Sequence, residues 1–152
     1  MKTSFEIPAN EINSYISLTK NLPGIAYKLN LKSGHMDFLN NMLTPVTGYK
    51  PSELTKSGIC SFKNLILQED RKKLDTEIRN SLNKKTIVNI EYRLRHKNGK
   101  IIFINDRGKP EYDKTGKPVY VNGVTFDITG RKESEEKFKR INRTYALLSQ
   151  IN

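Results

Sequence analysis

Residues 86–129 read TIVNIEYRLRHKNGKIIFINDRGKPEYDKTGKPVYVNGVTFDIT, and apolar and polar residues alternate through most of this stretch. A two-residue period is typical of a β-strand with one buried face. Two turn-forming clusters, Lys97-Asn98-Gly99 and Asp113-Lys114-Thr115-Gly116, interrupt the alternation. The stretch therefore predicts three antiparallel strands, over 86–95, 100–110 and 118–129.

The alternation also assigns the side chains of these strands to two faces. The face expected to form the core carries Val88, Ile90, Tyr92, Leu94, Ile102, Ile104, Val121, Gly123 and Thr125. The opposite face carries Phe103, Tyr120, Val124 and Phe126. Such a group is too apolar to be left in water, so we expect another surface to cover it.

The remainder of the chain adds helices and two more strands. Residues 9–21 predict an amphipathic helix, residues 24–31 and 36–40 a β-hairpin, and residues 41–68 short helical pieces broken by proline and glycine. Residues 69–84 and 131–152 predict longer helices. The expected fold class is α+β: a five-stranded antiparallel sheet with helices on one face, flanked by amphipathic helices at both ends.

These predicted elements divide the chain into an N-terminal helical extension (1–21), one domain (22–130) and a C-terminal helix (131–152). Phe138, Ile141, Tyr145 and Leu148 form a heptad stripe on this last helix, which fits either a coiled coil or packing within the chain.

Composition excludes several classes of function. The net charge is +11, but the basic residues are spread from Lys2 to Arg143, so we expect no nucleic-acid partner. No apolar run reaches the roughly 18 residues of a membrane span, so we expect no membrane insertion and a cytoplasmic location. Cys60 is the single cysteine, and His35 and His96 are the only histidines, which gives no metal-binding pattern.

Several motifs together resemble the PAS family. They are Leu22-Pro23-Gly24-Ile25-Ala26-Tyr27, Gly48-Tyr49-Lys50-Pro51-Ser52-Glu53-Leu54, Gln68-Glu69-Asp70-Arg71 with glutamine where the family usually has proline, Glu91-Tyr92-Arg93-Leu94-Arg95 before Lys97-Asn98-Gly99, and Gly123-Val124-Thr125-Phe126-Asp127-Ile128-Thr129 before Arg131-Lys132 and Glu135. The resemblance covers residues 22–135.

This resemblance implies a sensory and dimerisation module of a multidomain signal-transduction protein, such as a histidine kinase of a two-component system or a diguanylate cyclase. It implies no enzyme activity in the domain itself and an output domain (GAF, kinase or cyclase) outside this chain. Asp127 and Thr129 resemble the family's junction between the last strand and the output helix. A ligand-free protein–protein interaction scaffold is the alternative function.

We expect a homodimer, formed through the apolar outer face of the sheet and the N-terminal helix. The residues predicted for this surface are Ile12, Ile16, Phe103, Tyr120, Val124 and Phe126.

The inside of the sheet is a candidate site for a small, weakly polar ligand. The residues predicted to line its pocket are Tyr27, Asn40, Tyr92, Leu94, Ile104 and Thr125. The alternative is a fully packed core in which the tyrosine hydroxyls bond the backbone.

No cofactor is predicted. Cys60 follows Gly48-Tyr49 as the reactive cysteine does in flavin-binding LOV members, but Leu94 and Ile104 cannot hydrogen-bond a flavin ring. The helix over 69–84 lacks the histidine that would hold haem. Asp106 is expected near a strand end, capping a turn or pairing with an arginine, and we see no catalytic cluster.

Overall fold

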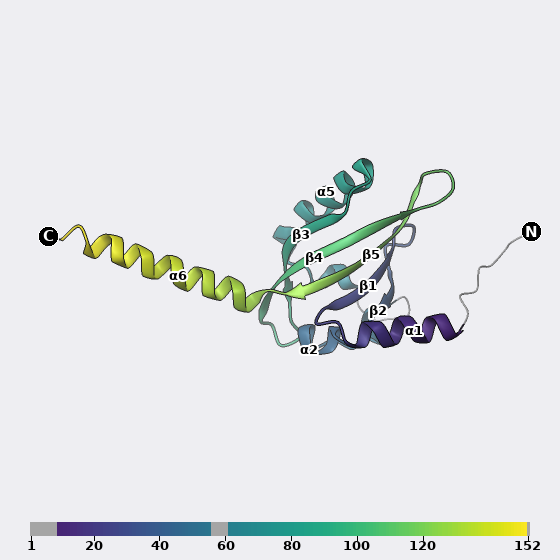
Figure 1. Ribbon diagram of the computed structural model, residues 1–152, viewed down its shortest axis with the longest axis horizontal. Coiled ribbons are helices and arrows are strands. Elements are labelled where there is room, and N and C mark those ends of the chain that lie inside the picture. The colour runs from purple at the N-terminus through teal and green to yellow at the C-terminus, as the bar shows by residue number, and fades with distance from the viewer. Residues whose placement is uncertain (1–8, 56–60, 152) are drawn as a thin grey trace, which may run out of the picture.

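The five strands of the sheet lie in the order β2-β1-β5-β4-β3, and each neighbouring pair is antiparallel (Figure 1). This computed structural model describes residues 9–55 and 61–151. Its elements are α1 (Ala9–Lys20), β1 (Ile25–Asn30), β2 (Met36–Leu39), α2 (Leu43–Thr47), α3 (Pro51–Leu54), α4 (Phe62–Leu65), α5 (Gln68–Lys84), β3 (Val88–Arg95), β4 (Ile101–Tyr112), β5 (Pro118–Asp127) and α6 (Thr129–Leu148). The predicted α+β fold is confirmed.

The two-residue alternation gives the sheet its buried face. Every second residue of β3, from Val88 to Leu94, is buried, and the intervening residues are partly or fully exposed. The same period continues through β4, where Ile102 and Ile104 are buried. Their burial in one core cluster, together with Leu54, Phe62 and Leu74 from the helices, places α3, α4 and α5 on this face.

An ion pair attaches α5 to the sheet. Both carboxylate oxygens of Asp70, in the first turn of α5, accept hydrogen bonds from the Arg93 guanidinium, and Oδ2 also accepts from the Arg93 backbone N–H. These bonds hold the pKa of Asp70 below its ordinary value. A carboxylate at this position also interacts favourably with the positive end of the helix dipole.

Several element boundaries differ from expectation by a few residues, and two of these differences have a visible structural cause. Strand β4 continues to Tyr112 instead of ending at Pro110, because the backbone pairing with β5 extends to Tyr112 and Pro118. Helix α6 begins at Thr129, two residues earlier than predicted. The Asp127 side chain accepts a hydrogen bond from the backbone N–H of Thr129. This N–H has no acceptor within the helix, so the bond to Asp127 allows the helix to begin at Thr129.

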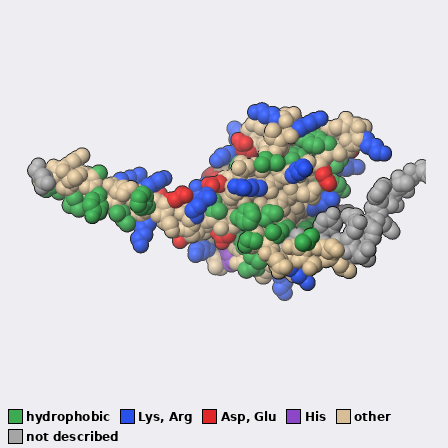
Figure 2. Space-filling model, in the orientation of Figure 1, with side chains coloured by type: hydrophobic (Ala, Val, Ile, Leu, Met, Phe, Trp, Pro, Cys, Tyr) green, Lys and Arg blue, Asp and Glu red, His purple; other side chains and the backbone are tan. Residues whose placement is uncertain are grey.

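Helix α6 extends away from the domain (Figure 1), and none of its residues is buried. Its apolar side chains lie along its length in Figure 2, and Phe138 and Tyr145 are 65% and 73% exposed. Within residues 9–55 and 61–151, no helix combines the length and the apolar character that crossing a bilayer would require.

Candidate functional site

A cavity of about 240 Å³ lies between the inner face of the sheet and helices α3, α4 and α5. Most of its wall is apolar, contributed by residues such as Leu54, Phe62, Leu74, Val88 and Val121. The polar side chains in the wall divide into two sets. The sheet contributes Tyr27, Tyr92 and Asp106, whereas Ser61, Lys63, Arg71 and Asp75 come from the helical region and His35 from the β1–β2 turn.

Two tyrosine hydroxyls hold the Asp106 carboxylate. Tyr27 donates to Oδ1 at 2.8 Å, and Tyr92 donates to Oδ2 at 3.0 Å. All three side chains are buried, and Asp106 is only 6% exposed. The three residues, called the Tyr-Asp-Tyr cluster below, form one hydrogen-bonded unit in the wall of the cavity.

Strand order brings this cluster together from three different strands. Tyr92 on β3 pairs with Ile104 on β4, so Asp106 is its diagonal neighbour on the same face, within reach of a long side chain. Tyr27 on β1 is separated from β4 by β5, and its ring must therefore cross β5 to reach Asp106.

A pair of glycines makes this crossing possible. Tyr27 lies opposite Gly123 on β5, and Gly123 lies opposite Gly108 on β4. A Cβ atom would lie 2.5 Å from the Tyr27 hydroxyl oxygen if added at Gly123, and 2.7 Å from it if added at Gly108. Both separations are shorter than van der Waals contact, so the ring can occupy this path only because both residues lack a side chain.

Burial dominates the electrostatics of the cluster. Desolvation raises the pKa of Asp106 to about 6, even though the hydrogen bonds from Tyr27 and Tyr92 act in the opposite direction. Desolvation, together with the nearby carboxylate, raises the pKa of both tyrosines. The two tyrosines therefore keep their hydroxyl protons, and Asp106 ionises at a higher pH than an exposed aspartate does.

The predicted pocket residues separate into three places. Tyr27 and Tyr92 line the cavity, whereas Asn40 lines a separate hollow near α1 and donates to the Gly24 carbonyl at 3.1 Å. Leu94, Ile104 and Thr125 are fully buried but line neither space. The cavity thus lies toward the Val88 and Val121 end of the sheet.

Asp106 was assigned to the wrong environment from the sequence. It lies in the middle of β4 on the inner face, not near a strand end, and its partners are tyrosines instead of a turn or an arginine. The alternation that places Ile102 and Ile104 inside also places Asp106 inside, and this signal could have found it. The expected alternative, tyrosine hydroxyls bonded to the backbone, is wrong for the same reason.

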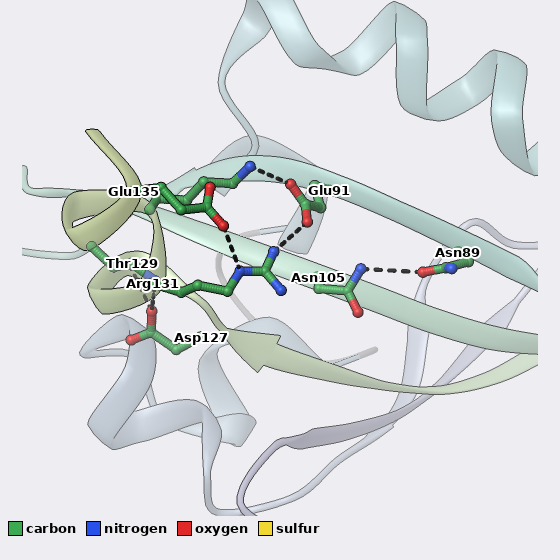
Figure 3. A network of polar contacts seen from close by, with 8 residues as sticks. Asn89, Glu91, Asn105, Asp127, Thr129, Arg131 and Glu135 are labelled. Atoms are coloured by element: carbon green, nitrogen blue, oxygen red, sulfur yellow. Dashed lines mark hydrogen bonds and ion pairs between the residues drawn. The ribbon is translucent and has the colours of Figure 1, made fainter. Parts of the chain in front are cut away.

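A second polar network joins α6 to the sheet (Figure 3). Asp127 Oδ1 accepts both the backbone N–H and the hydroxyl of Thr129, at 2.9 and 2.6 Å. The Thr129 hydroxyl oxygen in turn accepts the backbone N–H of Phe103 on β4 at 3.0 Å. The start of α6 is therefore connected to the C-terminal end of β5 and to the backbone of β4.

Glu91 on β3 adds ion pairs to the same helix turn. Its carboxylate contacts Arg131 Nη2 at 2.5 Å and Lys132 Nζ at 2.6 Å (Figure 3). The bonds from Lys132 and Arg131 lower the pKa of Glu91. These groups are partly exposed, so the pairs orient the helix more than they stabilise the fold.

Asp127→Ala is expected to loosen the first turn of α6. Removing an acceptor of this kind from a helix start costs about 1 kcal/mol, and amide exchange of the following residues should accelerate. Hydrogen exchange followed by mass spectrometry checks this.

Asp113→Ala is the matched control, because Asp113 accepts the backbone N–H and the hydroxyl of Thr115 in the same way in the β4–β5 turn. Unchanged exchange in α6 of Asp127→Ala, or equal acceleration in Asp113→Ala, would contradict the assignment of Asp127 to this junction.

Comparison with known proteins agrees with the fold described above. A family model described as PAS fold matches residues 37–125. A methyl sulfide methyltransferase-associated sensor from Methanosarcina acetivorans is 28% identical over 109 residues, which are 71% of this chain and 11% of that protein. The chain thus spans about a tenth of the length of this relative.

Solved structures show the same fold. A sensory box histidine kinase/response regulator from Burkholderia thailandensis superposes with a TM-score of 0.70 at 23% identity, covering 87% of this chain and 96% of that chain. The N-terminal domain of a diguanylate cyclase with a PAS/PAC sensor, from Marinobacter aquaeolei, gives a TM-score of 0.63 at 16% identity, covering 72% and 98%. With its five-stranded sheet, its helical layer and the matching family model, this chain belongs to the PAS-fold family.

Proposed function

We propose that this PAS sensor domain binds a small, largely apolar molecule in the cavity and reports its presence through α6. The observation that carries the proposal is the Tyr-Asp-Tyr cluster in the cavity wall. Burying a carboxylate without a cation lowers the stability of the folded protein, and an apolar residue at the same position would lower it less. Costly polar groups that converge on an apolar cavity are typical of a binding site.

The strands that carry the cluster also hold the output helix. Tyr92 on the inner face of β3 is adjacent to Glu91, which pairs with Arg131 and Lys132 of α6. On β4, Asp106 shares a strand with Phe103, whose backbone N–H bonds Thr129. A ligand that shifted β3 relative to β4 would therefore also move the start of α6. The size of this effect is limited by the difference between the ligand's affinities for the shifted and the unshifted arrangement of the strands.

The inner face of the sheet does not fit a flavin. Leu94 and Ile104, where a flavin ring would need hydrogen-bonding groups, are completely buried and offer only apolar atoms. Cys60 lies outside the described residues. Helix α5 has no histidine with which to hold haem. We therefore propose a small organic ligand, not one of these cofactors.

Binding of a ligand in the cavity should be measurable as a gain in the stability of the folded protein and as a change in the hydrogen exchange of α6. Small metabolites are screened by thermal shift against the protein and against Ile78→Trp, which places a larger side chain in the cavity wall. A ligand at 100 times its Kd stabilises the folded state by about 2.7 kcal/mol, and Ile78→Trp should abolish this gain.

Hydrogen exchange at the first turn of α6 should also change when the ligand binds. Binding that leaves this exchange unaltered contradicts the signalling role. A complete lack of binding leaves the ligand-free scaffold as the better function.

We further propose a homodimer through the outer face of the sheet. Phe103, Tyr120, Val124 and Phe126 are half-buried there, and Val124 and Phe126 lie against Gly24. Ile16 on α1 is 38% exposed, while the side chain of Ile12 lies outside the described part of the chain. The exposed apolar stripe of α6 would extend such an interface toward an output domain, for which we propose a kinase or a cyclase outside this chain.

Phe126→Asp is expected to convert the dimer into a monomer, because it places an unpaired charge in an apolar contact. Analytical ultracentrifugation measures this. Asn80→Asp is the control, since Asn80 is exposed on α5, which covers the opposite face of the sheet. A Phe126→Asp protein that remains folded and dimeric would show that the interface lies elsewhere.

A further inference from the structure

The Asp106 carboxylate has no cationic partner among the described residues. The lysine and the arginine in the cavity wall are engaged elsewhere: Lys63 pairs with Asp75 at 3.3 Å, and Arg71 donates to the carbonyl oxygens of Ile66 and Asn64. The Tyr-Asp-Tyr cluster supplies hydrogen bonds but no positive charge. A buried carboxylate is satisfied by a cation together with hydrogen bonds, so one component is missing.

The cluster retains hydrogen-bonding capacity toward the cavity. Each Asp106 oxygen accepts one hydroxyl, and a carboxylate offers roughly four acceptor positions in total. The two hydroxyl oxygens donate to Asp106 and can themselves accept. The rings of Tyr27, Tyr92 and Phe62 are also part of the wall, and aromatic faces attract cations. Every one of these features favours a ligand that donates hydrogen bonds and carries positive charge.

The remaining wall sets the size and polarity of the rest of the ligand. An apolar cavity of roughly 150 Å³ is enough to hold benzene, and this cavity of about 240 Å³ is larger. Leu74 and Ile78 on α5 line the cavity from the helical layer, and Val121 on β5 adds an apolar side chain next to Tyr27. The body of the ligand is therefore apolar and somewhat larger than a benzene ring.

We propose that the cavity recognises an organic ammonium ion, an amine with a compact apolar body, whose charged nitrogen binds Asp106 while Tyr27 and Tyr92 orient the carboxylate. This ligand class rests on the proposed function, because it assigns the chemistry of the same cavity. Overall charge cannot produce the preference, since a chain with a net charge of +11 repels cations in general. The selectivity must come from the site.

The test compares four probes of similar size: phenethylamine, phenethyl alcohol, propylbenzene and phenylacetate. Titration calorimetry at about pH 8 keeps both the amine and a carboxylate of raised pKa ionised. Phenethylamine should bind with a Kd at least about tenfold lower than either neutral probe, as expected for a hydrogen bond to a charged group. Asp106→Asn should lose this preference while still binding the neutral probes, which also shows that its cavity is intact.

The outcomes separate the ligand class from the function. Equal affinity for amine and alcohol, tighter binding of phenylacetate, or an amine preference that survives Asp106→Asn would overturn the ammonium assignment and leave a ligand-binding cavity in place. Failure of all four probes to bind the protein would overturn the assignment too. If the metabolite screen against Ile78→Trp also finds nothing, the proposed function fails with it.

Discussion

Asp106→Asn is expected to be more stable than the unmodified protein at pH 8, and this advantage should shrink as the pH falls toward 4. Burial raises the pKa of Asp106 to about 6 in the folded protein, against an ordinary value of 3.8. The folded state therefore binds the proton more tightly than the unfolded state. The free energy of unfolding gained by protonation is complete below pH 4 and is lost as the pH rises through 6.

The pH-dependent part of the difference amounts to about 3 kcal/mol, since each pKa unit corresponds to about 1.4 kcal/mol. Urea denaturation of both proteins at a series of pH values measures it. Other carboxylates contribute equally to both proteins and cancel in the difference. Among them are Asp70 and Glu91, whose lowered pKa values stabilise the fold above pH 4.

Asp75→Asn serves as the control, because Asp75 forms only an exposed pair with Lys63 and should change stability little at any pH. A difference between Asp106→Asn and the unmodified protein that does not vary with pH would mean that the carboxylate does not titrate as its burial implies. A confirmed difference would show that the site is maintained at the expense of stability, which is expected where a group serves binding.

The fold could be predicted because its determinants are local. Alternation over 86–129 places Val88, Ile90 and Leu94 inside, and the turn residues at Asn98-Gly99 and Thr115-Gly116 mark where the strands reverse. The predicted start of α6 was two residues too late. The observed start depends on the side chain of Asp127, whose hydrogen bonds to Thr129 allow the helix to begin at that residue.

The cavity could not be located in the same way, because its position depends on packing between distant segments. Tyr27 and Tyr92 were placed correctly on the inner face, but so were Leu94 and Ile104, and the sequence does not show which end of the sheet is closely filled. Ile66 from the helical region forms a bridge with Leu94, which closes that end. The partnership of Tyr27 with Asp106 also requires the strand order, since the two residues are 79 positions apart in the sequence and β1 and β4 meet only across β5.

Gly123→Ala is expected to lower the free energy of unfolding by about 3 kcal/mol, the upper part of the range for overfilling a packed core. The new Cβ would lie 2.5 Å from both Cζ and the hydroxyl oxygen of Tyr27, and 2.7 Å from the Arg107 carbonyl oxygen. Tyr27 would have to leave its path across β5, and its hydrogen bond to Asp106 would then be lost. Thermal and urea denaturation measure the loss.

Gly130→Ala is the matched control: an added Cβ meets no atom within 4 Å, and alanine stabilises a helix relative to glycine by up to about 1 kcal/mol. Tyr27→Ala separates the two causes of strain. If the tyrosine ring is the main obstacle, Gly123→Ala should cost clearly less in the Tyr27→Ala background, because the two residues are in contact and their effects are not additive. An equal cost in both backgrounds would assign the strain to the Arg107 carbonyl. The glycine would then serve strand pairing alone, and the path of Tyr27 to Asp106 would not explain its presence.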